Sequence, residues 1–360
     1  MDAKERYLAV YDDSERFKLD KVPKFVQYVR EEFIIKHRLK LNFNLATNFS
    51  NMTYFSVPYE LGFDAVFAPF PLCVKIKSVK IKLDNGEFLR IGEDGQKVHK
   101  KTHYYEGGFI HSIEILDELR SNMKVVDMSK DIQKVVNNYE KFNKKIFPIL
   151  MLDGIFDRVW KSMGIVQFSR HYRKNSNLYR ELIKFYSEIT ELNLLGLVNA
   201  TQGKTKIINI LDDLAFKGRT FISPGRWKKD IMPSYKKITS LITDSGLIPQ
   251  IHSDGDITEL ISLLQEAGFH GLQGWEGGCN PYYINDNFPD FVVIGFGDVS
   301  SILPYGSREV IINYVKDLMT ALKENRHFVI GPSTVCHEKI PIENIQCFNL
   351  AAEKFGKYSN

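Results

Sequence analysis

The sequence predicts an α/β protein built on a (β/α)8 TIM barrel, with an N-terminal extension that contains an antiparallel β flap. Short apolar runs alternate with amphipathic helical stretches over residues 146–360, a pattern typical of parallel βαβ units. With two further runs nearer the N-terminus, the count reaches eight, which suits a closed barrel better than an open sheet. No G-x-G-x-x-G or Walker loop follows any of these runs. The sequence therefore lacks the motifs that would predict a nucleotide-binding doubly wound fold.

The predicted strands are short and apolar, as expected for strands that are buried on both faces. They are Val22–Tyr28 (the weakest), Asp64–Phe70, Phe147–Leu152, Ile207–Leu211, Leu247–Ile251, Leu272–Trp275, Phe291–Phe296 and Phe328–Ile330. Helical patterns lie between most of the later strands, at Tyr179–Glu191, Pro224–Thr243, Ile257–Glu266 and Arg308–Lys323. Ser223-Pro224 is a clear helix start, and Pro233 predicts a kink or a restart inside the helix that follows.

The chain divides into two unequal parts that we expect to form one unit. Residues 1–145 hold the extension, the first barrel strands and the flap, and residues 146–360 hold the rest of the barrel. In the flap, Val74–Leu83 alternates Val and Ile with Lys, which is the signal of a half-buried strand. Asp84-Asn85-Gly86 then supplies a tight turn, and Glu87–Ile91 runs back as the second strand.

Composition excludes several classes of protein. The 360 residues are 44% hydrophobic and 26% charged, as in an ordinary folded protein. The net charge of +4 is too small to argue for binding to nucleic acid or an anionic membrane. No apolar run is long enough to span a bilayer, and the charged N-terminus is no signal peptide. The four cysteines lack paired spacing. A reducing compartment therefore fits best, and we expect a cytoplasmic protein.

Polar residues stand at the carboxyl ends of the predicted strands, where the chemistry of a barrel lies. They are Asp153, Asp212, Asp213, His252, Asp254, Glu276, Asp298, Ser333 and Cys336. We assign Asp212, Asp213, Asp298 and Ser333 to substrate binding. The alternative for Asp212 and Asp213 is that they anchor loops or cap helices.

His252, Glu276 and Cys336 are spaced by roughly one and two βα repeats, so their side chains can meet over the barrel mouth. An imidazole, a carboxylate and a thiolate form a three-ligand zinc site with one position open for substrate. Asp254 follows closely enough to be a further ligand or a partner of one. The alternative is that residues 252–255 form only a strand-ending turn and that Cys336 is a buried thiol.

Several motifs, in order along nearly the whole chain, resemble the uroporphyrinogen decarboxylase-like superfamily. The segments that carry the resemblance are Lys4–Ala9, Asp20–Pro23, Gly62–Val66, Asp212–Ala215, Ile222–Pro224, Ile251–Gly255, Phe296–Asp298, Leu303–Gly306 and Ile330–Ser333. The resemblance implies a (β/α)8 barrel. True uroporphyrinogen decarboxylases carry an Arg-Gln-Ala-Gly-Arg segment that grips the substrate's carboxylates, and Lys24–Arg30 lacks that pattern. Decarboxylation in the haem pathway is therefore not expected.

The other main activity of the superfamily is corrinoid-dependent methyl transfer, in which a zinc site in the barrel mouth works with a separate corrinoid-binding protein. Thiol-methylating members use a His-x-Cys pair and a later Cys, whereas this chain has His252, then Asp254, and later Cys336. By similarity, Glu276 fits a zinc-ligand position. Loss of one thiolate makes the site harder and favours polarisation of an ether or alcohol oxygen.

The resemblance therefore implies a methyltransferase of the O-demethylase type, with zinc in the barrel and cobalamin on a partner protein. His252, Asp254 and Glu276 are the expected catalytic residues, with a small methylated compound such as a methoxylated aromatic as substrate. The aromatic stretch Phe49–Phe70 could line an apolar wall or simply pack in the core. A homodimer is also compatible with the sequence. Two alternatives remain: a metal-free lyase or decarboxylase on the same barrel, and a non-catalytic member that binds a small molecule.

Overall fold

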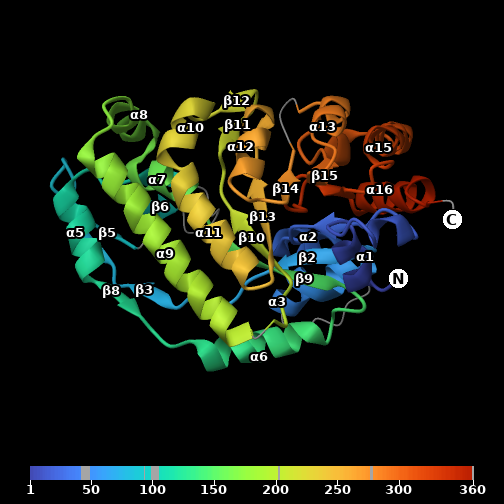
Figure 1. Cartoon of the computed structure of the whole chain (residues 1–360), viewed down its shortest axis with the longest axis horizontal. Coiled ribbons are helices and arrows are strands. Elements are labelled where there is room, and N and C mark those ends of the chain that lie inside the picture. The colour runs from blue at the N-terminus through green and yellow to red at the C-terminus, as the bar shows by residue number, and fades with distance from the viewer. Residues whose placement is uncertain (42–48, 93, 99–104, 202, 276–278, 359–360) are drawn as a thin grey trace.

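The computed structural model contains a (β/α)8 TIM barrel, which confirms the predicted fold (Figure 1). It describes residues 1–41, 49–92, 94–98, 105–201, 203–275 and 279–358. The eight parallel strands follow one another around the barrel as β1 (Phe25–Val26), β2 (Ala65–Ala68), β9 (Phe147–Asp153), β10 (Ile207–Leu211), β13 (Ile248–Ser253), β14 (Gly271–Gly274), β15 (Val292–Gly297) and β16 (Phe328–Pro332). Between β16 and β1, the Ile330 N–H donates to the Pro23 carbonyl at 3.0 Å, so the ends of the sheet meet.

The barrel strands are covered by helices that bury an apolar stripe against the sheet. After β1 come α2 (Glu31–His37), α3 (Phe49–Asn51), the π-helical turn η2 (Met52–Ser56) and α4 (Val57–Glu60). After β9 and β10 come α7 (Phe156–Met163), α8 (Ile165–Arg173), α9 (Asn177–Thr201), α10 (Pro224–Asp230) and α11 (Met232–Asp244). The remaining helices are η3 (Thr258–Leu260), α12 (Ile261–Glu266), α13 (Pro281–Asn287), α14 (Ile302–Tyr305), α15 (Arg308–Leu322) and α16 (Ile342–Phe355).

The helix expected after Ser223-Pro224 does restart near Pro233. Helix α10 ends at Asp230, and α11 begins at Met232 with Pro233 in its first turn, where a missing N–H costs no hydrogen bond. Among the helices of the described residues, none combines the length and the apolar character needed to cross a bilayer.

The N-terminal helix α1 (Ala3–Ala9), with the 3-10 turn η1 (Arg16–Lys18), packs against one end of the barrel. Tyr7 of α1 is fully buried, and its hydroxyl donates to Gln250 Oε1 on β13 at 3.1 Å. Arg6 forms ion pairs with Asp20 at 2.8 Å and with Asp64, just before β2, at 2.7 Å. These contacts join α1 to the start of the strands, which is the end opposite the carboxyl-terminal mouth.

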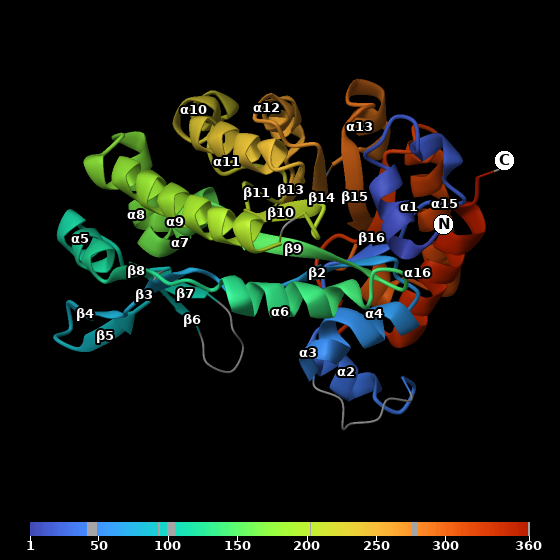
Figure 2. The same cartoon turned by 60° about the horizontal axis from the view of Figure 1, so that its bottom comes forward.

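The predicted flap lies between β2 and β9, and its strand pairing differs from the prediction. It consists of β3 (Val74–Ile76), β4 (Val79–Lys82), β5 (Phe88–Ile91), β6 (Gln96–Val98), β7 (Tyr105–Gly108), α5 (Ile113–Ser121), β8 (Met123–Val125) and α6 (Ser129–Glu140). The expected hairpin is β4–β5, but β3 is a separate strand that pairs with β8. The reason is visible in the sequence, because the apolar alternation slips by one residue between Ile76 and Val79. Figures 1 and 2 both place β3, β5, β8 and α5 at one end of the molecule, far from α15 and α16.

Candidate functional site

A cavity of about 830 Å³ lies at the mouth of the barrel, where the carboxyl ends of the strands meet. We call it the mouth cavity. Parallel strands bring the residues that follow each strand to this one end, although those residues are far apart in the chain. Its polar lining includes Gln27, Tyr28, Arg30, Asp153, Asp157, Lys161, Asp212, Asp213, His252, Asp254, Thr334, His337 and Glu338.

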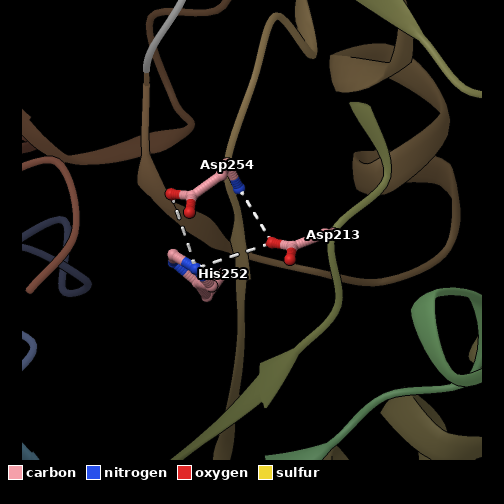
Figure 3. Close-up of side chains that lie close together, drawn as sticks. All are labelled: Asp213, His252 and Asp254. Atoms are coloured by element: carbon pink, nitrogen blue, oxygen red, sulfur yellow. Dashed lines mark hydrogen bonds and ion pairs between the residues drawn. The ribbon is translucent and has the colours of Figure 1, made fainter. Parts of the chain in front are cut away.

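Three side chains converge in this cavity: Asp213 after β10, and His252 and Asp254 at the end of β13 (Figure 3). The distance from His252 Nε2 is 3.8 Å to Asp213 Oδ1 and 3.7 Å to Asp254 Oδ1. The three ligand atoms all lie within 4.8 Å of one another, so together they could hold a metal ion. Among the described residues, this is the one group of three or more His, Cys, Asp or Glu side chains with that geometry.

Gln273 on β14 fixes the tautomer of His252. Its Nε2 donates to the Ser333 carbonyl at 2.7 Å, so its Oε1 is the atom that faces His252 Nδ1, at 2.5 Å. An amide oxygen only accepts, and Nδ1 must therefore carry the proton. In the neutral ring, Nε2 then presents a lone pair towards two carboxylate oxygens. The negative charge of the two carboxylates that face this lone pair is balanced either by a second proton on the ring or by a cation between the three atoms.

Replacing Gln273 with leucine should therefore weaken metal binding about 10- to 100-fold, because nothing would hold the Nδ1 proton in place. Affinity is measured by competition with a zinc-binding dye. Gln265→Leu, at an exposed position on α12, is the matched control and should bind like the parent. Equal affinities for all three proteins would contradict the role assigned to Gln273.

Asp213 is held between His252 and a half-buried cation, Lys161. Its Oδ2 lies 3.4 Å from Lys161 Nζ on α7, and its Oδ1 accepts the Asp254 N–H at 3.3 Å. Burial alone raises the pKa of Asp213, but Lys161, His252 and that N–H outweigh burial and bring the pKa below its ordinary value. Asp213 is thus ionised, as a metal ligand must be. Lys161 also pairs with Asp157, whose pKa is raised by burial.

Asp212 anchors a loop rather than facing the metal group. Its carboxylate accepts the backbone N–H groups of Phe156 at 3.0 Å and Asp157 at 2.6 Å, and the hydroxyl of Tyr235. It is 1% exposed, although it borders the mouth cavity. These contacts agree with the alternative stated for Asp212 in the sequence analysis, that it anchors a loop or caps a helix. Its effect is to fix the start of α7, the helix that carries Lys161.

The remaining predicted residues are placed differently. Glu276 lies outside the described residues. Cys336 is fully buried where its N–H donates to the Tyr28 carbonyl at 3.0 Å, and burial raises the pKa of its thiol. Cys336 does not belong to the group formed by Asp213, His252 and Asp254. In the Phe49–Phe70 stretch, Met52, Phe55 and Phe67 pack in the core, and none of the described residues lining either mouth-side cavity comes from that stretch.

Asp298 and Ser333 border a neighbouring cavity of about 400 Å³, which we call the side cavity. Asp298 Oδ1 accepts the N–H groups of Ser300 at 2.7 Å and Ser301 at 2.8 Å, ahead of α14. Asp254 and Ser300 line both cavities, so the two spaces meet beside the metal group.

Sequence reasoning did not find the roles of Gln273 and Lys161, and it gave Asp213 a different role. Gln273 was detectable as the one polar residue in the apolar run Leu272–Trp275. The sequence carried no comparable signal for Lys161, because a lysine on an amphipathic helix ordinarily lies in solvent.

The chain is similar to a known protein family and to solved structures. The family model of uroporphyrinogen decarboxylase (URO-D) matches residues 158–355, more than half of the chain. No match was found among curated protein sequences. A solved structure of a methyltransferase from Methanosarcina mazei aligns with a TM-score of 0.65 at 16% identity, covering 99% of each chain. The pneumococcal exo-beta-D-N-acetylglucosaminidase StrH aligns with a TM-score of 0.45 at 10% identity, covering 94% of this chain and 84% of that one. The extent of the family match shows that this chain belongs to the uroporphyrinogen decarboxylase family.

Proposed function

We propose that this protein is the methyltransferase component of a corrinoid-dependent system. In this proposal, it moves a methyl group between a methoxylated aromatic compound and a cytoplasmic corrinoid-binding protein. The observation that carries the proposal is the convergence of Asp213, His252 and Asp254, with the Nε2 lone pair facing two carboxylate oxygens. The likeness in fold to a methanogen methyltransferase supports the same activity.

The donor set fits a divalent metal ion. One imidazole nitrogen and two carboxylate oxygens are ligands that zinc accepts, and without a thiolate the site is harder than a thiol-activating one. When bound, the ion would act as a Lewis acid for an ether oxygen of the substrate. The protein's own part is to orient the ligands: Gln273 fixes the imidazole, and Lys161 and the Asp254 N–H fix Asp213.

When present on the partner protein, the reduced corrinoid would supply the nucleophile that takes the methyl group as a methyl cation equivalent. The electrons of the broken C–O bond would stay on the oxygen, and the phenolate would take a proton from water. Lys161, whose pKa is raised overall by Asp157 and Asp213 against the effect of burial, remains charged at neutral pH. Its charge is balanced by these two carboxylates, and it keeps Asp213 ionised as a ligand.

Metal removal tests the proposal. The purified protein should hold about one zinc ion per chain, and dialysis against a chelator should abolish formation of methylcobalamin from cob(I)alamin and 4-methoxybenzoate. Re-addition of zinc should restore it. Elemental analysis measures the zinc content, and the visible spectrum of the corrinoid measures the formation of methylcobalamin. Absence of zinc after metal-replete expression would contradict the proposal and favour the metal-free lyase.

Two ligand sets can be separated in the same assay. Asp213→Asn should lose zinc, because a neutral amide replaces an ionised ligand. Cys336→Ser should keep zinc, because the thiol lies outside the group of three. The reverse result would support the set of His252, Glu276 and Cys336 expected from the sequence.

A further inference from the structure

The flap carries two pairs of like charges that face each other across its strands. Lys75 on β3 is directly opposite Lys124 on β8, and Lys80 on β4 is directly opposite Arg90 on β5. All four side chains are exposed. Residues directly opposite in an antiparallel pair have their Cβ atoms about 5 Å apart on one face, and like charges there are destabilising. Both strand pairs therefore bear a repulsion that the fold does not require.

The β4–β5 pair has an apolar side and a basic side. Val79, Ile81 and Ile91 are buried on the apolar side. Because side chains alternate along a strand, the other side presents three cations and one aromatic ring, in the residues Lys80, Lys82, Phe88 and Arg90. We call Lys75, Lys80, Lys82, Arg90 and Lys124 the flap cations. None of them forms a salt bridge with a carboxylate of the described residues.

Protection of strand edges does not account for this arrangement. Lysine on an exposed edge strand prevents pairing with other chains. A lysine opposite a glutamate would protect the edge equally well and would add an attraction instead of a repulsion. Concentrated positive charge without counter-charges favours contact with an anionic partner, which would relieve the repulsion on binding.

The flap stands on the mouth side of the barrel. It follows the carboxyl end of β2, and its last strand, β7, is fixed to α7, the helix that carries Lys161. The Tyr105 hydroxyl donates to the Lys161 carbonyl at 2.8 Å, and the Ile110 N–H donates to the Ser162 carbonyl at 2.9 Å. Figure 2 shows β4 and β5 beyond β6 and β7, at the outer end of the molecule. A partner held by the flap cations therefore lies on the same side of the barrel as the mouth cavity.

Acidic residues that flank the flap cations restrict the kind of partner. Asp84 and Glu87 are exposed in the turn between β4 and β5, and Asp127 is exposed just after β8. A continuous polyanion, such as a nucleic acid or an anionic bilayer, would be repelled by these carboxylates. A protein surface with carboxylates over a short stretch can match the cations and avoid the flanking acids.

We propose that the flap cations bind an acidic segment of a partner protein. The exposed ring of Phe88, which lies 4.2 Å from Lys80 Nζ, supplies an apolar contact between the charges. The proposed function requires a corrinoid-binding protein to reach the mouth cavity, and that protein is the partner assigned to the flap. For the identity of the partner alone, the inference rests on the proposed function.

Binding of fluorescein-labelled deca-glutamate to the full chain, measured by fluorescence anisotropy at low ionic strength, tests the charge contact. In the variant Lys75→Glu/Lys80→Glu, each like-charge pair becomes a pair of opposite charges. Binding should weaken at least about tenfold, because two attractive charges become repulsive. The midpoint of thermal unfolding should not fall, because the repulsion across the strands is removed. Weaker binding by a variant that is no less stable than the parent is a result that misfolding does not produce.

Lys316→Glu/Lys354→Glu is the matched control. Both lysines are exposed, on α15 and α16 at the other end of the molecule, and the net charge changes by the same amount as in the test variant. The control should bind the peptide like the parent. Equal binding by all three proteins would overturn the inference and leave the lysines as edge protection. A labelled thymidylate decamer that binds more tightly than the peptide, and loses its binding in Lys75→Glu/Lys80→Glu, would overturn it in favour of a nucleic acid.

The inference and the proposed function fail separately. Methyl transfer to free cob(I)alamin involves no partner protein, so Lys75→Glu/Lys80→Glu should form methylcobalamin at the parent's rate. If the peptide binds as expected but the parent forms no methylcobalamin, the flap contact stands and the methyltransferase is wrong. If methylcobalamin forms but the peptide binds equally to all variants, the flap contact is wrong and the methyltransferase stands.

Discussion

Replacing His252 with alanine should remove the bound metal ion and slow methyl transfer by at least about a thousandfold. His252 supplies the one nitrogen ligand, and its Nε2 lies between the two carboxylate oxygens. Without the ring, Asp213 and Asp254 would be left as two carboxylates at the junction of the cavities, a weaker and less directed site. Zinc per chain and the rate of methylcobalamin formation are measured together.

His270→Gln is the matched control for this substitution. His270 is exposed at the start of β14, the opposite end of the barrel from the mouth, and its replacement should leave zinc content and rate unchanged. Activity that survives His252→Ala, or metal that remains bound, would contradict the proposed centre. A parent that contains no metal but loses activity on His252→Ala would instead indicate an imidazolium held by the two carboxylates.

Replacing Arg6 with methionine should destabilise the protein by about 3–5 kcal/mol, because Asp64 would become a buried charge without its cation. Arg6 is 7% exposed and joins α1 to Asp20 and to Asp64, which is 8% exposed. The free energy of unfolding is measured by urea titration at pH 7. Lys18→Met removes a solvent-exposed ion pair with Glu15 and should leave the unfolding curve nearly unchanged.

Acid should reduce the difference between Arg6→Met and the parent. The hydrogen bond and charge of Arg6 lower the pKa of Asp20 from 3.8 to about 2. A lowered pKa stabilises the folded state fully above pH 3.8, and this contribution is lost as the pH falls through about 2. A gap between the two proteins that stays constant down to pH 2 would show that Asp20 takes no part.

The barrel was predictable because its strands are short apolar runs at regular spacing, and the helix restart followed from the chemistry of Pro233. The pairing of β3 with β8 was not predictable from pattern alone. The slip in the apolar alternation predicts a break between β3 and β4. It does not identify the distant segment, β8, that pairs with β3.

The candidate site was predictable only in part, for a geometric reason. Spacing along the chain places His252 and Asp254 at the mouth, and the structure brings Asp213 beside them. Side chains alternate in direction along a strand, and this alternation stops at the strand's last residue. The direction of a side chain just after that point therefore depends on the residue at which the strand ends. Asp212 and Asp213 are neighbours in sequence, yet one anchors α7 and the other faces the metal group. Sequence periodicity does not resolve that difference of one residue.

The closure of the barrel joins β1 and β16, which are separated by most of the printed sequence. Residues 25–26 are synthesised long before residues 328–332, so β1 lacks its partner on this side until β16 is present. Until then, the outer edges of the growing sheet stay unpaired, and an unpaired strand edge invites association with other chains. Because the closing contact joins distant parts of the chain, we expect the barrel to fold more slowly than a locally connected fold of the same length.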